Sequence, residues 1–205
     1  NNINITECPN IKTFRIHQYD ERETKWFNSG TNIIDLTKFE NLETFTCNIT
    51  TQDLDTILLP STLKTIWIKL MCGFTTAEYP NKCSKAKCTL KNIYFKEDHP
   101  NGYEGIDFGN RELTELCLSG VIQSTGIIKG VNTKNIYVSP VFNNMDEKER
   151  GSELYPQVKV QGKIDLSNYN WTEAYWWFTN VDFTSDNLEF VMPNDWDYLI
   201  DTRLK

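Results

Sequence analysis

Histidine is scarce in this chain, and the residue patterns that mark common catalytic sites are missing. His17 and His99 are the two histidines among 205 residues. The sequence holds no G-x-S-x-G, H-E-x-x-H, G-x-x-x-x-G-K-[ST] or G-x-G-x-x-G pattern. These patterns mark nucleophile elbows, zinc peptidase helices and phosphate-binding loops. We therefore expect no catalytic residue and no cofactor.

Long apolar runs and an excess of positive charge are missing as well. The longest apolar runs are Ile57–Leu59 and Tyr175–Phe178, far below the roughly 20 residues of a membrane-spanning helix. Lys and Arg number 21 against 28 Asp and Glu, which gives a net charge of −7. Such a balance argues against nucleic-acid binding. The chain begins Asn1-Asn2-Ile3-Asn4, which we interpret as a mature or trimmed start.

A phrase of the form L-x-x-L-x-L recurs along the chain. Six copies begin at Ile11, Leu42, Leu63, Leu90, Leu113 and Thr133, and two degenerate copies lie around 164–166 and 188–191. The middle apolar residues of these copies are 20 to 31 residues apart. A shorter apolar-x-apolar phrase precedes many copies, at 34–36, 57–59, 106–108, 164–166 and 181–183. Residues 164–166 fit either phrase, so the register of the last two units stays open.

These phrases predict short strands that stack. One strand cannot bury its apolar face alone, so successive units form a continuous core. We expect a β-rich solenoid over residues 1–205, with about eight degenerate leucine-rich-repeat-like units, one parallel sheet, irregular connections and few helices. A β-sandwich is the alternative. The solenoid predicts nine buried residues in adjacent strands of one sheet: Leu63, Ile66, Ile68, Leu90, Ile93, Phe95, Leu113, Leu116 and Leu118.

The phrases and their connections resemble a known family. Residues 57–66 (ILLPSTLKTI), 39–45 (FENLETF) and 185–190 (SDNLEF) are similar to the irregular leucine-rich repeats of the bacterial BspA-like family. The resemblance implies a curved solenoid on a secreted or cell-surface protein, used for adhesion or partner binding. It implies no enzyme activity, and no catalytic residue is carried over.

One position of each phrase should face outward on the predicted sheet. The residue between the last two apolar positions points away from the core. Down the stack it is Arg15, Thr46, Trp67, Tyr94, Cys117 and Tyr137. Beside it runs a second column of Lys12, Glu43, Lys64, Lys91, Thr114 and Lys134. We expect Trp67, Tyr94 and Tyr137 to form an exposed aromatic stripe, and Cys117 to be exposed unless a loop covers it.

This face is the candidate binding site. Exposed aromatic rings beside charges are typical of interface hot spots. The predicted binding residues are Arg15, Thr46, Trp67, Tyr94, Tyr137, Lys64, Lys91 and Lys134. We expect a non-catalytic protein-binding or adhesion module that acts through the concave sheet. The alternatives are a carbohydrate-binding protein, a β-helix carbohydrate-active enzyme with scattered carboxylates, and a ladder that only stabilises the sheet.

Aromatic residues near the C-terminus and six cysteines complete the candidates. Trp171, Tyr175, Trp176, Trp177 and Phe178 fall within a predicted cap over 167–205, or else form a sugar-stacking platform. Cys8 has no predicted role, and Cys47 should be a small core residue. Cys72, Cys83 and Cys88 could form a disulfide in a secreted protein or, with His99, a zinc site. Because their spacing is loose, we expect no metal.

Overall fold

The computed structural model consists of strands and turns. It describes residues 8, 10–17, 33–49, 54–70, 90–119, 127–139, 158–167, 177–178, 181–182 and 184–191. No helix occurs in these ranges, so none of the described residues forms a helix that could cross a membrane. Every pairing between the described strands is parallel.

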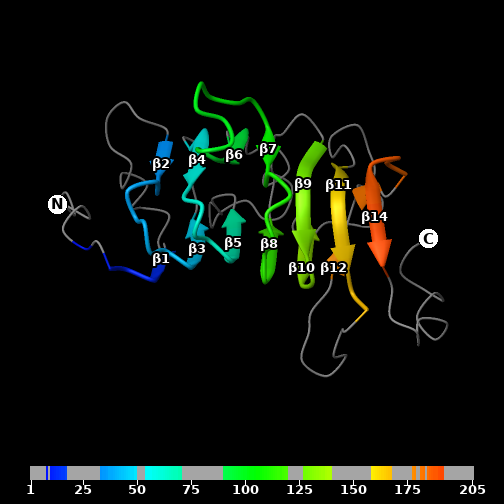
Figure 1. The fold of residues 1–205 in the computed structure, drawn as a ribbon, viewed down its shortest axis with the longest axis horizontal. Coiled ribbons are helices and arrows are strands. Elements are labelled where there is room, and N and C mark those ends of the chain that lie inside the picture. Colours follow the sequence, from blue (N-terminus) through cyan, green and yellow to red (C-terminus); the bar gives the residue numbers. More distant parts are fainter. Residues whose placement is uncertain are drawn as a thin grey trace, which may run out of the picture.

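The strands form two parallel sheets, which we call sheet A and sheet B. Sheet A has the order β1 (Thr13–His17), β3 (Thr44–Ile49), β5 (Thr65–Leu70), β8 (Glu115–Ser119), β10 (Ile136–Ser139) and β12 (Trp177–Phe178). Sheet B has the order β2 (Ile33–Asp35), β4 (Thr56–Leu59), β6 (Asn92–Phe95), β7 (Ile106–Asp107), β9 (Ile127–Thr133), β11 (Val158–Asp165) and β13 (Val181–Asp182). A further strand, β14 (Leu188–Val191), also pairs with β11. In Figure 1, sheet B lies along the upper side and sheet A along the lower side.

Short turns carry the chain from sheet B to sheet A. After β2, Asp35 Oδ1 accepts a hydrogen bond from the backbone N–H of Thr37 at 3.0 Å. The Leu42 N–H then donates to the Phe39 carbonyl at 3.1 Å and closes a turn just before β3. The next connection repeats this geometry, since the Leu63 N–H donates to the Pro60 carbonyl. Asp35 and Pro60, both of residue types that favour turns, thus lie where β2 and β4 end.

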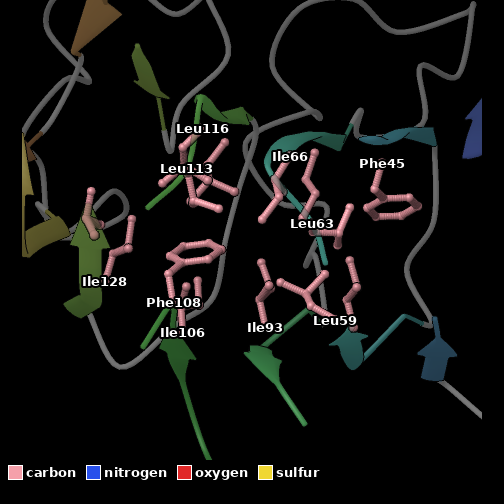
Figure 2. Packing of buried hydrophobic residues seen from close by; sticks show 14 of the residues in the cluster. Phe45, Leu59, Leu63, Ile66, Ile93, Ile106, Phe108, Leu113, Leu116 and Ile128 are labelled. Carbon is pink, nitrogen blue, oxygen red and sulfur yellow. The ribbon is translucent and has the colours of Figure 1, made fainter. Parts of the chain in front are cut away.

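The core lies between the two sheets. Strand side chains alternate between two faces, so every second residue of each strand points toward the other sheet. Figure 2 shows Phe45 and Ile66 of sheet A pointing toward Leu59 and Ile93 of sheet B. All four are fully buried. Cys47 is also fully buried, which confirms its predicted place in the core.

The predicted burial is confirmed, but the single sheet is wrong. All nine predicted core residues are buried. The copy at 90–95, however, forms β6 of sheet B, where Ile93 pairs with Ile57 and Ile106. Sheet A passes directly from Ile66 to Leu116. Both phrases end in the same apolar-x-apolar strand, so their periodicity does not say which sheet a copy joins.

The register near the C-terminal end, which the sequence leaves open, is given by the strand pairing. Ile164 belongs to β11, where it pairs with Thr133 and Phe190. It therefore does not continue the column of middle residues Ile66, Leu116 and Ile136. Strands β12, β13 and β14 fall inside the predicted cap region 167–205 and extend the two sheets there.

Candidate binding face on sheet A

Sheet A carries a straight row of side chains on its outer face. Neighbouring strands pair Arg15 with Thr46, Thr46 with Trp67, Trp67 with Cys117, and Cys117 with Tyr137. We call this set the Trp67 row. Paired strands lie about 4.8 Å apart, so the row forms a ladder across five strands. The structure thus brings together four of the predicted binding residues: Arg15, Thr46, Trp67 and Tyr137.

Exposure along the Trp67 row is uneven. Trp67 is 41% exposed, whereas Tyr137 is half-buried. Cys117 is 5% exposed, although its side chain lies on the outer face. Burial and, to a smaller extent, the charge of Glu115 raise the pKa of the Cys117 thiol to about 12. A thiol with such a pKa is a poor nucleophile near neutral pH, so we assign Cys117 no chemical role.

The second predicted column is divided between the two sheets. Lys12 Nζ lies 3.1 Å from Glu43 Oε1 beside sheet A. The hydrogen bond from Lys12, followed by the charges of Lys12 and Lys64, lowers the pKa of Glu43. Lys134 Nζ lies 3.8 Å from Glu112 Oε1. Lys91 instead precedes β6 of sheet B and lies 3.4 Å from Asp55 Oδ1, so its place on the binding face is wrong.

Tyr94 is not part of an exposed stripe. It lies on β6 of sheet B and is 5% exposed. Strands β6 and β7 are parallel neighbours, so the chain between them must return to the starting edge. Residues 96–105 make this return across the outer face, where His99 and Tyr103 contact the Tyr94 ring edge-on. The prediction that Trp67, Tyr94 and Tyr137 share one face is therefore wrong.

His99 holds this return segment in place. Its ring stacks on Tyr103 with centroids 4.2 Å apart, and its Nε2 lies 3.2 Å from Asp107 Oδ2. Lys129 Nζ adds a contact 5.8 Å from the centre of the Tyr103 ring. Sequence reasoning missed this cluster. The sequence feature that could have revealed it is the short segment between the phrases at 93–95 and 106–108. This segment has too few residues to form a strand in sheet A and then return to sheet B.

Arg111 and Asp98 clamp the same region. Arg111 donates hydrogen bonds to both Asp98 carboxylate oxygens, at 2.7 and 3.0 Å, and its guanidinium lies 4.7 Å from the centre of the Phe95 ring. The hydrogen bond from Arg111 lowers the pKa of Asp98, against the opposing effect of burial. The folded chain therefore binds a proton at Asp98 less readily than the unfolded chain does.

The Arg111–Asp98 pair predicts a specific acid response. A carboxylate with a lowered pKa stabilises the fold above its unfolded pKa of about 3.9, and this stability is lost as pH falls through the folded value. Arg111→Gln should lower the free energy of unfolding at pH 7 and flatten its decline below about pH 4. Urea unfolding between pH 2 and 7 measures both effects. Lys38→Gln, which removes an exposed charge elsewhere, is the control, and equal acid slopes for the two variants would contradict the assignment.

The remaining candidates form no second site in the described ranges. His17 lies on the outer face of β1, where its Nε2 is 3.1 Å from Asn48 Nδ2. Cys8, Cys47 and Cys117 are free thiols. No group of three or more His, Cys, Asp or Glu in the described ranges could hold a metal ion. The other candidates lie outside those ranges: Cys72, Cys83, Cys88, Trp171, Tyr175 and Trp176.

Comparison with known proteins gives no match. This holds for protein-family models, for curated proteins and for solved structures. The function must therefore be inferred from the residues of this chain.

Proposed function

We propose that the chain is a non-catalytic binding or adhesion module that holds its ligand on the outer face of sheet A. In this proposal the strand pairs are degenerate leucine-rich-repeat-like units of a solenoid. The resemblance to the BspA-like family supports that reading, together with a secreted or cell-surface location. A protein partner and a carbohydrate both fit such a module.

The path of the chain supports the solenoid. The chain alternates between the two sheets in β2–β3, β4–β5, β9–β10 and β11–β12. Each new strand pairs in parallel with one from a neighbouring unit, as in β2 with β4 and β3 with β5. Stacking of this kind produces long, regular outer faces, which repeat proteins commonly use for binding.

The exposure of Trp67 carries the functional proposal. Trp67 lies on β5, which is paired on both sides, so its backbone is held by hydrogen bonds to β3 and β8. Its side chain is nevertheless 41% exposed. A large ring on a rigid support loses little conformational freedom on binding, which is why tryptophan is enriched in hot spots.

Four of the described acidic residues have structural partners, which supports a non-catalytic role. Asp55 bonds the Thr56 hydroxyl and the Asn92 amide, Asp98 bonds Arg111, and Asp107 contacts His99. Each of these carboxylates therefore holds a strand or a turn together. Glu43 is likewise paired with Lys12.

Trp67→Ala tests the proposal. Loss of the ring should weaken binding by about 2 kcal/mol, or roughly 30-fold. Binding of the chain would be measured on printed arrays of purified extracellular-matrix proteins and of glycans. Ile33→Ala is the matched control, because Ile33 is 46% exposed but lies on sheet B. Equal signals from both variants on every bound probe, or no binding on either array, would overturn the proposal.

A further inference from the structure

We propose that the ligand of the sheet A face is an acidic oligosaccharide, stacked on Trp67 and held by Arg15 and Lys69. This inference rests on the function proposed above and names its ligand. Three observations carry it: the small size of the apolar patch, the polar groups that surround the ring, and the local charge.

Among the side chains that the structure describes, the exposed apolar surface on this face is a single ring. Among the described residues, Trp67 and Ile33 are the exposed large hydrophobic side chains, and Ile33 belongs to the other sheet. Tyr94 is covered on sheet B and Tyr137 is half-buried. A stable protein interface buries about 800 Å² on each partner around a largely apolar centre. One isolated ring does not provide such a centre, whereas a sugar ring needs only one aromatic surface of its own size.

Small polar side chains surround the ring. Trp67 pairs with Thr46 on β3, and the flanking registers of β3, β5 and β8 place further hydroxyl groups around it. These neighbours are Thr44, Thr65 and Ser119. All three and Thr46 are half-buried. Hydroxyl groups both donate and accept hydrogen bonds, as the hydroxyls of a saccharide require.

The charge on this face is opposite to that of the whole chain. Arg15, Lys64 and Lys69 are exposed on or beside sheet A, and none of them has an ion-pair partner among the described residues. Lys12 is already paired with Glu43, which leaves Glu115 as the opposing carboxylate on these strands. The chain as a whole carries −7. A basic face on an acidic protein attracts and orients an anionic ligand.

The spacing of these groups sets the length of the ligand. Arg15 lies two strands from Trp67 in the same row, a separation of about 10 Å at the usual strand spacing. Lys69 lies two residues beyond Trp67 on β5, on the same face. A ligand that touches the ring and both cations must span more than one strand spacing. An oligosaccharide with carboxylate or sulfate groups meets this requirement, and a monosaccharide does not.

Binding to four soluble probes tests the inference. The probes are oligogalacturonate, heparin oligosaccharide, the neutral maltohexaose, and a polyglutamate peptide as an acidic polypeptide, each titrated by calorimetry. We expect an acidic saccharide to bind at least tenfold more tightly than maltohexaose and polyglutamate, with affinity falling as salt rises. The double variant Arg15→Gln/Lys69→Gln should bind the acidic saccharide at least tenfold more weakly than the wild type does. The control variant Lys38→Gln/Lys91→Gln changes two exposed lysines outside the face. Its affinity for the acidic saccharide should stay within twofold of that of the wild type.

The outcomes separate this inference from the proposed function. If maltohexaose binds as tightly as the acidic saccharides or more tightly, the ligand need not be acidic and the inference is wrong. If polyglutamate does so, the ligand need not be a saccharide and the inference is wrong as well. In both cases a tenfold loss of affinity in Trp67→Ala would still support the proposed binding face on sheet A. If Trp67→Ala binds every probe like the wild type, both the face and its ligand are wrong.

Discussion

Ile66→Ala should destabilise the chain by about 2–5 kcal/mol, the range for truncating a buried aliphatic side chain. Ile66 lies on the third strand of sheet A and is fully buried. Its register neighbours are Phe45 and Leu116, which are also fully buried (Figure 2). These neighbours are fixed by strands paired on both sides, so they cannot collapse into the space that the truncation leaves.

Trp67→Ala provides the internal control for this result. Trp67 follows Ile66 directly but points to the opposite face, so its removal should cost less than about 1 kcal/mol of stability. Urea unfolding followed by circular dichroism compares both variants without relying on tryptophan fluorescence. A near-neutral Ile66→Ala, or an equal loss in both variants, would contradict the inward and outward alternation of β5. An equal loss would also indicate that the Trp67 row stabilises the sheet by cross-strand packing.

The positions of core residues could be predicted from the sequence because a strand has a simple period. Alternation places Ile66 and Ile68 on one face and Trp67 on the other wherever the strand pairs, and all three predictions are confirmed by their burial. The same alternation predicts that Arg15, Thr46 and Tyr137 lie in one row with Trp67, and the strand register confirms this for all three.

The sheet that each strand joins could not be predicted from the same period. A phrase such as that at 90–95 is equally compatible with either sheet, because both sheets bury one face against a shared core. The assignment depends on the connections. After β6, a turn that begins with the Asp98 N–H donating to the Phe95 carbonyl directs the chain back over sheet B. Tyr94 is therefore covered by residues close to it in sequence, which a repeat pattern does not reveal.

Cys117 points outward and is nevertheless buried. It pairs with Trp67 on one side and Tyr137 on the other, and its side chain is 5% exposed. Direction and exposure therefore differ at this position. Alternation along the strand predicts the direction of a side chain and not how far that side chain is covered.

Gly162 has the most constrained backbone position that we identify. It lies at a β-bulge in β11, where the pairing with β9 shifts between Val160 and Gly162. Its φ is +127°, a conformation that residues with a side chain rarely adopt. Its N–H donates to the Asn187 carbonyl at 2.9 Å. A Cβ at this position would collide with the Val131 carbonyl oxygen and lie 2.6 Å from the Val131 backbone nitrogen.

Gly162→Ala should therefore lower the free energy of unfolding by about 3 kcal/mol or more, because backbone strain adds to a collision that no side-chain rotation relieves. Gly102→Ala separates these two contributions. Gly102 has a φ of +92°, but the nearest atom to its added Cβ would be the Tyr94 hydroxyl oxygen at 3.9 Å, an ordinary contact. We expect this variant to lose about 1 kcal/mol from backbone strain alone. Urea unfolding of both variants measures the difference. Equal losses would mean that β9 and β11 separate at little cost, and that the bulge at Gly162 does not fix their register.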